Sequence, residues 1–283
     1  MLGKISIFLR MIKIEHSLFA MPFALTGMIL AAGGIPPVAK IFWIIVAMIA
    51  ARTFAMGVNR VVDAEIDLNN PRTSAREIPA GKISKAEALI YILISFFIYE
   101  YATYALNILC FILSPIPVII FIIYAYSKRF TFLSHLILGV SLGLAPVGAW
   151  VAIAGIFDTG IILLGIGVLF WVAGFDILYA IEDIKFDKAY GLYSLPSYLG
   201  IKNSLYLSRI FHLVAFITFT YIKFYYDLGY IYLTGIIFIG LIMFYEHSLV
   251  KIDNLSKLNV AFFNMNAYIS LTVFIFTSID ILL

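Results

Sequence analysis

Long apolar runs follow one another along nearly the whole chain, and short polar stretches separate them. A helix needs about 20 mostly apolar residues to cross the hydrocarbon core of a bilayer, and the runs predict nine such spans. Only Asn107 and the region of Pro115 and Pro117 separate the third span from the fourth. The pattern predicts an all-α polytopic membrane protein. The nine predicted spans are residues 17–35, 40–58, 85–106, 107–127, 134–155, 159–181, 203–222, 228–247 and 258–281.

The composition agrees with this architecture. Apolar residues make up 63% of the 283 residues and charged residues 12%, and the mean hydropathy is +1.05. Such values are typical of polytopic membrane proteins and argue against a soluble domain. No linker or break in composition divides the chain, so we expect a single domain over residues 1–283. The first apolar run is interpreted as a retained span, and the single cysteine, Cys110, excludes a disulfide and a thiolate metal site.

The 19 Lys and Arg residues are distributed unevenly between the two predicted sides of the membrane. Most lie on the side that holds the N-terminus, whereas the loops of the opposite side hold only Lys40 and Lys223. Positive charge collects on the cytoplasmic side, which places the N-terminus inside and the C-terminus outside. We expect the plasma (inner) membrane of a prokaryote. Ahead of the first span, Lys4, Arg10 and Lys13 alternate with apolar residues and predict an interfacial amphipathic helix.

Half of the 16 acidic residues fall in two short windows on the predicted cytoplasmic side. The first has the pattern N-x-x-x-D-x-x-x-D, formed by Asn59, Asp63 and Asp67. The second has the pattern D-x-x-Y-x-x-x-D-x-x-x-D, formed by Asp176, Tyr179, Asp183 and Asp187. Residues four apart share one face of a helix, with Cβ atoms about 5–6 Å apart, so the carboxylates of each window repel one another. A divalent cation between them reverses that repulsion.

The chemistry of these windows favours Mg²⁺ and a diphosphate. The candidate ligands are hard oxygens, which suit magnesium better than zinc; the four histidines show no ligand spacing and are interpreted as interfacial or structural. Cations beside the carboxylates predict a magnesium-bridged diphosphate. The alternative, ordinary solvated charges, is disfavoured by two copies of the pattern on one side. The basic candidates are Arg72, Arg76, Lys128, Arg129, Lys185 and Lys188.

Arg52 lies inside the second predicted span, where an ionisable residue is a functional candidate. It precedes Asn59 by two helical turns and shares its face. A guanidinium at that depth is suited to bind a carboxylate with two hydrogen bonds, and snorkelling toward the interface is the competing explanation. Tyr124, Tyr126 and Tyr179 lie near the charged windows, where their rings are candidates to face a cavity and stabilise a cation.

Nearly the whole chain resembles the UbiA superfamily of intramembrane aromatic prenyltransferases. The matching segments are "LRMIKIEHSLFAMPFALTG", "NRVVDAEIDLNNPRTSAREIPAGKIS", "YAYSKRFTFLSHLILGVSLGLAPVGAW" and "DILYAIEDIKFDKAYGLYSLP". The nearest resemblance is to the 4-hydroxybenzoate polyprenyltransferases and their menaquinone-pathway relatives. Many members have Asn-Asp at the start of the first motif, whereas this chain has Asn59-Arg60. The spacing of the motif is kept, so this difference concerns the subfamily and not the chemistry.

The resemblance implies nine helices around a central cavity, with the two aspartate motifs over its cytoplasmic end. It also implies two magnesium ions that hold the diphosphate of a polyprenyl donor. Arg129 matches a basic residue assigned to the diphosphate, Arg72 and Lys188 are weaker candidates for it, and Arg52 matches the position that meets the acceptor's carboxylate. The implied magnesium or diphosphate ligands are Asn59, Asp63, Asp67, Asp183 and Asp187; Lys128, Tyr124, Tyr179 and Asp176 complete the expected substrate-binding set.

The expected function is magnesium-dependent transfer of a polyprenyl group to the aromatic ring of 4-hydroxybenzoate, with release of diphosphate. The nearest alternative acceptor is a naphthoate of menaquinone synthesis; relatives that use haem, homogentisate or glycerol-phosphate acceptors rank lower. Asp183, Asp176 and the released diphosphate remain open as the group that removes the ring proton. A cation-coupled secondary transporter is the hypothesis from another class, and it is disfavoured because the acids cluster at one face and not at the midplane. The expected partners are the two substrates and the lipid bilayer, with no nucleic acid and no obligate protein partner.

Overall fold

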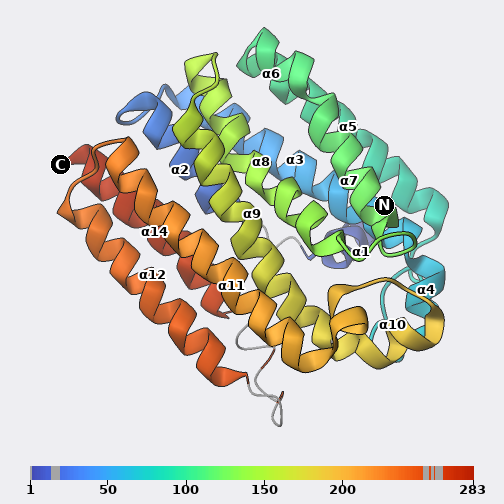
Figure 1. Ribbon diagram of the computed structural model, residues 1–283. Coiled ribbons are helices and arrows are strands. Elements are labelled where there is room, and N and C mark those ends of the chain that lie inside the picture. The colour runs from blue at the N-terminus through green and yellow to red at the C-terminus, as the bar shows by residue number, and fades with distance from the viewer. Residues whose placement is uncertain (1, 14–19, 251–254, 256–257, 259–263) are drawn as a thin grey trace.

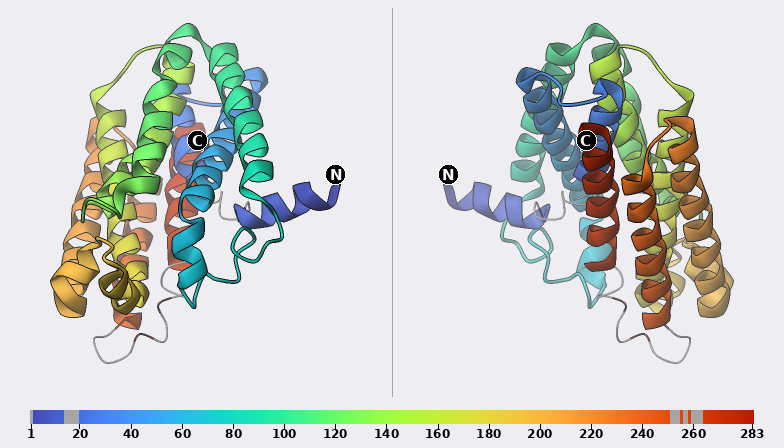
Figure 2. Two further views of the ribbon diagram at one scale, coloured as in Figure 1. Left: turned by 90° about the vertical axis from the view of Figure 1, so that its right-hand side faces the viewer. Right: turned by 90° about the vertical axis from the view of Figure 1, so that its left-hand side faces the viewer.

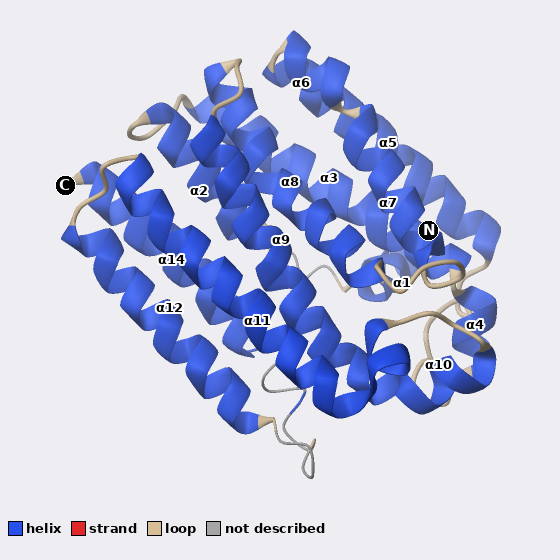
Figure 3. Cartoon of the chain, in the orientation of Figure 1, coloured by secondary structure: helices blue, strands red, loops and turns tan. Residues whose placement is uncertain are grey.

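The computed structural model describes residues 2–13, 20–250, 255, 258 and 264–283. These residues form helices joined by loops and contain no strand, which confirms the predicted all-α fold (Figure 3). The long helices form a bundle, whereas the N-terminal helix α1 (Leu2–Met11) lies across it (Figures 1 and 2). The lead-in helix predicted from the alternation of basic and apolar residues is therefore present.

Seven helical segments in the described part of the chain are long and apolar enough to cross a membrane. Two shorter apolar helices, α2 (Met21–Ala32) and α14 (Asn266–Leu282), correspond to the first and ninth predicted spans, which extend outside the described residues. The predicted number of nine spans is thus approximate. The long segments are α3 (Val38–Val62), α5 (Lys85–Leu106), α6 (Ile108–Leu113) with α7 (Pro115–Ser127), α8 (Ser134–Ala154), α9 (Thr159–Ala180), α11 (Leu195–Tyr225) and α12 (Tyr230–Leu249).

The break between the third and fourth spans follows from local chemistry. Asn107 has an extended backbone (φ −170°, ψ 166°), and its side chain accepts a hydrogen bond from the backbone N–H of Cys110, 2.8 Å away. This is the geometry of a helix N-cap, so α6 begins directly after α5 ends. Ser114 and Pro115 then separate α6 from α7, because proline has no N–H to continue the helical hydrogen bonds.

The core is built around α9, whose apolar side chains are buried on most sides. Trp171 is completely buried between Phe23 of α2 and Phe175. Glycines let α8 and α9 approach closely, since a Cβ atom on Gly143 would lie 2.5 Å from the carbonyl oxygen of Gly165. Small residues permit this kind of approach between membrane helices. The tight contact fixes α9, and with it the second acidic window.

The two acidic windows lie at the same end of the bundle. The first continues α3 into α4 (Ala64–Asn69), and the second continues α9 through the short 3₁₀ helix η2 (Ile181–Asp183) into α10 (Ile184–Tyr190). Figure 1 shows α4 and α10 at this end, and the carboxyl end of the chain lies toward the other. The motifs and the C-terminus thus lie toward opposite ends of the bundle, and the end that faces the cytoplasm stays a prediction.

Candidate active site

Both acidic windows bend at their central aspartate. Asp63 lies between α3 and α4 with φ −86° and ψ 2°, and Asp183 lies between η2 and α10 with φ −96° and ψ 0°. This sparsely populated backbone region is frequent among active-site residues. Each bend lies between the first and the last polar residue of its motif. The two windows therefore share a backbone geometry as well as a sequence pattern.

A polar cavity of about 130 Å³ lies between the two windows. Its wall comes from both motifs, from the loop after α4 and from the C-terminal part of α7. The structure thus brings together most of the residues predicted for the site. Of the residues predicted from the sequence, those in the wall are Asn59, Asp63, Asp67, Arg72, Arg76, Tyr124, Lys128, Asp176, Tyr179, Asp183 and Asp187.

Five residues named as candidates do not line this cavity: Tyr126, Lys185, Lys188, Arg129 and Arg52. Lys188 is exposed on α10 and is not among the lining residues, and its assignment as a weaker diphosphate candidate stays a prediction. Arg129 lies behind the wall, where it pairs with Asp63 at 3.2 Å and donates to the carbonyl oxygens of Val62 and Ala125. Arg52 lines a separate, apolar cavity.

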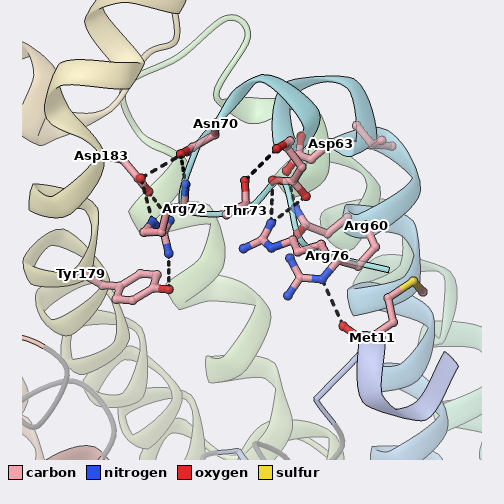
Figure 4. A network of polar contacts seen from close by, with 12 residues as sticks. Met11, Arg60, Asp63, Asn70, Arg72, Thr73, Arg76, Tyr179 and Asp183 are labelled. Atoms are coloured by element: carbon pink, nitrogen blue, oxygen red, sulfur yellow. Dashed lines mark hydrogen bonds and ion pairs between the residues drawn. The ribbon is translucent and has the colours of Figure 1, made fainter. Parts of the chain in front are cut away.

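Arginines neutralise the acids of both windows (Figure 4). Arg76 donates to both carboxylate oxygens of Asp67, at 2.7 Å each. Arg72 forms a two-pronged ion pair with Asp183, with one Nε–Oδ1 distance of 2.9 Å, and its Nη1 donates to the Tyr179 hydroxyl at 2.6 Å. Such two-pronged pairs are among the strongest hydrogen-bonded ion pairs in proteins. The positive charges expected around a diphosphate are therefore already placed at the carboxylates.

The charge of Asp63 is only partly compensated by its neighbours. Its carboxylate accepts a hydrogen bond from the Asn59 amide at 3.0 Å and pairs with Arg129. Burial nevertheless raises the pKa of Asp63, and it outweighs the opposing effects of Arg129 and Lys128. Removing a carboxylate from water disfavours its charged form. A further cation beside Asp63 would lower its pKa again.

The sequence did not single out several residues that complete the site. The Asn70 amide donates to Asp183 at 3.4 Å, and its Oδ1 accepts the backbone N–H of Arg72 at 3.0 Å. The Ser194 hydroxyl donates to Asp187 at 2.8 Å. The "NNPR" segment, with Asn70 two residues before Arg72, is a turn signal that could have been used. No sequence signal pairs Ser194 with Asp187.

His135 contacts a residue of the site, and its burial agrees with the interpretation of the histidines as interfacial or structural. Its Nδ1 lies 2.6 Å from the carboxylate of Asp176, which is in the cavity wall, and the imidazole is fully buried. The two residues are 41 positions apart and come from different helices. Local spacing therefore carries no information about their contact.

The unusual Arg60 of the first motif holds the N-terminal helix. Its Nε donates to the carbonyl oxygen of Met11 at 3.2 Å (Figure 4), and Arg52 donates to the carbonyl oxygen of Lys13 at 3.3 Å. A helix C-terminus carries partial negative charge and unpaired carbonyl groups. The two arginines therefore bind the C-terminal end of α1 and the residues after it, and this is a structural reason for Arg60 at this position.

A second cavity, of about 280 Å³ and almost wholly apolar, lies between α2, α3, α5, α7 and α8. Arg52 is its one charged lining residue among the described residues. Tyr124 is in the wall of both cavities. An amphiphile with an anionic head and an apolar chain matches this pair of spaces, with Tyr124 at the boundary between them.

The donor atoms of the polar cavity suit magnesium in type. Carboxylate and amide oxygens from Asn59, Asp63, Asp183 and Asp187 are the hard ligands that Mg²⁺ prefers, usually with substrate phosphates completing the coordination. Within the described ranges, no three His, Cys, Asp or Glu side chains are arranged as a ready metal cluster. Arginine and serine occupy some of the carboxylate oxygens. The residues thus fit a metal shared with an anionic substrate better than a metal held by protein alone.

Comparison with known proteins places the chain among membrane prenyltransferases. Residues 20–268 match the model of the UbiA prenyltransferase family. A 4-hydroxybenzoate octaprenyltransferase of Shewanella woodyi is 28% identical over 289 residues, which covers 99% of this chain and 98% of the relative. One from Actinobacillus pleuropneumoniae is 31% identical over 188 residues, 66% of this chain and 63% of the relative.

Solved structures share the fold. A UbiA homolog from Aeropyrum pernix K1 superposes with a TM-score of 0.86 at 31% identity, over 95% of this chain and 99% of that one. A UbiA homolog from Archaeoglobus fulgidus, solved with GPP and Mg²⁺, gives a TM-score of 0.70 at 19% identity, over 94% and 99% of the two chains. The bundle and the position of its helices are therefore those of these proteins.

Proposed function

Because the chain belongs to the UbiA prenyltransferase family, we propose that it transfers a polyprenyl group from polyprenyl diphosphate to the aromatic ring of a phenolic acid. We propose 4-hydroxybenzoate as that acid, on the strength of relatives named 4-hydroxybenzoate octaprenyltransferase that align along nearly the whole chain. The donor's head would lie in the polar cavity and its chain in the apolar one. The enzyme is an integral membrane protein, and the positive-charge bias supports a plasma membrane with the site toward the cytoplasm.

The observation that carries this proposal is the shared wall of the two cavities at Tyr124. A polyprenyl diphosphate has an anionic head joined to an apolar chain at one carbon. The protein divides its interior in the same way, with arginines and acids on one side of Tyr124 and an almost wholly apolar space on the other. The reacting carbon would then lie next to Tyr124.

In this proposal the acids would bind the diphosphate through magnesium ions, and the arginines would bind it directly. Two magnesium ions, the number that the family resemblance implies, would be held by Asn59, Asp63, Asp67, Asp183 and Asp187 together with the substrate. Bound Mg²⁺ supplies positive charge that stabilises the leaving diphosphate. Arg72 and Arg76 now pair with Asp183 and Asp67 and are placed to exchange those carboxylates for phosphate oxygens. Lys128 adds a further positive charge to the same wall.

The carbon–oxygen bond of the donor breaks with its electron pair left on the diphosphate. The ring carbon ortho to the phenol hydroxyl forms the new carbon–carbon bond to the prenyl group. The apolar cavity keeps water from the allylic cation, because its lining, which includes Ile44, Leu138 and Ala145, is almost wholly apolar. The arginines stabilise the charge that develops on the leaving group, which is where preorganised donors contribute most to rate.

Arg52 is the proposed partner of the acceptor's carboxylate. It is the charged residue of the apolar cavity wall, and a guanidinium binds a carboxylate with two parallel hydrogen bonds. Its bond to the Lys13 carbonyl is long, at 3.3 Å, so a carboxylate would compete well for it. The acceptor would then lie with its acid at Arg52 and its ring toward Tyr124.

Product formation with purified protein tests this function. In nanodiscs with geranyl diphosphate and Mg²⁺, we expect prenylated 4-hydroxybenzoate and one diphosphate released per product. Dihydroxynaphthoate and homogentisate, offered in the same assay, should react more slowly. Faster reaction with dihydroxynaphthoate would indicate that the acceptor is a naphthoate of menaquinone synthesis. No product with any phenol, together with ion-coupled uptake in vesicles, would support a transporter and refute the enzyme.

A further inference from the structure

His135 and Asp176 form a pair at the wall of the polar cavity. His135 is the second residue of α8, and Asp176 lies near the C-terminal end of α9. The distance from His135 Nδ1 to Asp176 Oδ2 is 2.6 Å, short for a hydrogen bond between these groups. The imidazole is completely buried, while the carboxylate reaches the cavity. In this pair, a carboxylate in the cavity wall is therefore held by a buried imidazole.

The surroundings of His135 fix its tautomer. Its Nε2 is buried and has no hydrogen-bond partner in the described part of the chain. A protonated imidazole would bury an unpaired N–H together with a charge, which is costly. A neutral ring that donates Nδ1–H to Asp176 leaves only a lone pair at Nε2. In that tautomer the Nδ1–H of His135 holds one oxygen of Asp176.

Asp176 differs from the three acids of the site that pair with arginines. Asp63, Asp67 and Asp183 each pair with an arginine, whereas the described residues give Asp176 no lysine or arginine within ion-pair distance. A carboxylate engaged by a guanidinium has fewer lone pairs left for a proton. The second oxygen of Asp176, Oδ1, can therefore accept a proton.

Asp176 also lies near the boundary of the two cavities. It shares the wall of the polar cavity with Tyr124, the residue common to both walls. The new carbon–carbon bond must form near that boundary, because the donor's head and its chain lie on opposite sides of it. The ring carbon that receives the prenyl group also carries the proton to be removed. Asp176 is thus on the side of the boundary where that proton must leave.

We propose that Asp176 accepts the ring proton and that His135 positions it; this inference rests on the proposed prenyl transfer. After the carbon–carbon bond forms, the ring is a cation with hydrogen and prenyl on the same carbon. The carbon–hydrogen electron pair returns to the ring, and the proton goes to Oδ1 of Asp176. The protonated carboxyl then gives it to the released diphosphate or to water in the polar cavity. Recovery of aromaticity drives the step, so placement matters more than base strength.

The ring-hydrogen isotope effect tests this assignment. We compare turnover of 4-hydroxybenzoate with that of its 3,5-dideuterated form, using geranyl diphosphate and Mg²⁺. In the wild type, breaking the donor's carbon–oxygen bond limits the rate, so we expect no isotope effect. In Asp176→Asn, kcat should fall by about 10²–10⁴-fold, the usual contribution of a general base, and the deuterated acceptor should react more slowly than the protiated one.

Variants of His135 separate positioning from packing. His135→Leu fills the buried site without a donor and should give a smaller fall in kcat with the same new isotope effect. His135→Gln restores a donor to Asp176 and should return both values toward the wild type. Ser134→Ala, at the neighbouring buried position of α8, should leave the isotope effect unchanged. Magnesium-dependent binding of a non-reactive thiodiphosphate donor analogue should persist in all variants and report that they are folded.

The outcomes are distinct. An isotope effect that stays at the wild-type value in Asp176→Asn and His135→Leu would overturn the inference while product formation by the wild type upheld the proposed function. Equal losses in His135→Leu and His135→Gln would overturn the positioning role of His135. Absence of product from the wild type with every phenolic acid would refute the proposed function and, with it, the proposed role of His135 and Asp176.

Discussion

Arg72 and Asp183 form a two-pronged ion pair that joins the loop after the first acidic window to the bend of the second. The same guanidinium donates to Tyr179 and has its carbon 5.0 Å from the centre of that ring. Asn70 fixes the loop, since its amide reaches Asp183 and its oxygen receives the backbone of Arg72. The two windows are therefore held together across more than 100 positions of sequence by the side chains of Arg72 and Asn70.

Replacement of Arg72 by lysine tests whether this fork also serves the donor. Lysine keeps the charge but offers no planar pair of N–H donors. A hydrogen bond to a charged group contributes about 1.5–3 kcal/mol, so kcat/KM for geranyl diphosphate should fall by about 10–100-fold. Steady-state kinetics measure it. Lys202→Ala, at an exposed lysine of α11, is the control and should change little. An unchanged kcat/KM in Arg72→Lys would mean that Arg72 contributes only its positive charge and not its two-pronged geometry.

Asp183→Asn should nearly abolish turnover while the protein stays folded. The amide is the same size as the carboxylate but is a poor magnesium ligand, and it leaves Arg72 without its anion. We expect kcat to fall by at least about 10²–10³-fold, comparable to the loss of one group that stabilises transition-state charge. Activity as a function of Mg²⁺ concentration measures the effect. If added Mg²⁺ restored full activity to the variant, Asp183 would contribute affinity only.

The residues that the sequence could and could not predict differ in how they make contact. Asn59, Asp63 and Asp67 are four apart, so the helical repeat alone placed them together. The two windows could be predicted to form one site, because both carry the same pattern on one predicted side of the membrane. Asp67 and Arg76 lie only nine apart, but a loop of irregular backbone decides their contact. Periodicity cannot predict such a loop.

Long-range pairs between helices were beyond sequence reasoning for a different reason. His135 and Asp176 meet because glycines allow α8 and α9 to pack closely, which sets their relative height. A shift of one helical turn would separate them by about 5.4 Å. The break at Asn107, by contrast, was predictable, because the side chain that caps α6 is next to its own target in sequence. Helix ends are local features, whereas the height of one helix against another is not.

The raised pKa of Asp63 predicts how the metal-free protein responds to pH. Burial favours the protonated carboxyl in the folded state, so the folded protein binds this proton at a pH where the unfolded chain has released it. Its contribution to stability is complete below the unfolded pKa of about 3.9 and is lost as pH rises through the folded value. With EDTA present, Tm should decrease over this window.

The variant Asp63→Asn isolates that contribution. It cannot titrate, so the decrease of Tm with rising pH should be smaller than in the wild type. Glu65→Gln is the matched control, because hydrogen bonding to Lys85 lowers the pKa of the exposed Glu65 and gives the opposite sign. Thermal unfolding in EDTA at several pH values measures both. A steeper pH dependence in Asp63→Asn than in the wild type would contradict the assignment.

Arg60 should control how firmly the N-terminal helix is attached. In Arg60→Met the hydrogen bond to the Met11 carbonyl is lost while much of the buried volume is kept. We expect faster hydrogen exchange of the backbone amides of α1, measured by mass spectrometry. Arg10→Ala, an exposed arginine on α1 itself, is the control and should leave the exchange rate of those amides nearly unchanged. Equal exchange in Arg60→Met and the wild type would mean that the apolar face of α1, with Phe8, suffices to hold it.

Arg52 allows the acceptor site to be separated from the donor site. It lines the apolar cavity and not the polar one, so its loss should remove the acceptor's carboxylate partner and leave the diphosphate ligands in place. In Arg52→Met the KM for 4-hydroxybenzoate should rise by about 10–100-fold, the value of one charged hydrogen-bonded pair, while the KM for geranyl diphosphate should change little. An uncharged phenol of similar size should react equally well with wild type and variant, because it lacks the group that Arg52 binds. Equal losses for donor and acceptor would instead mean that Arg52 acts through its bond to Lys13 and the position of α1.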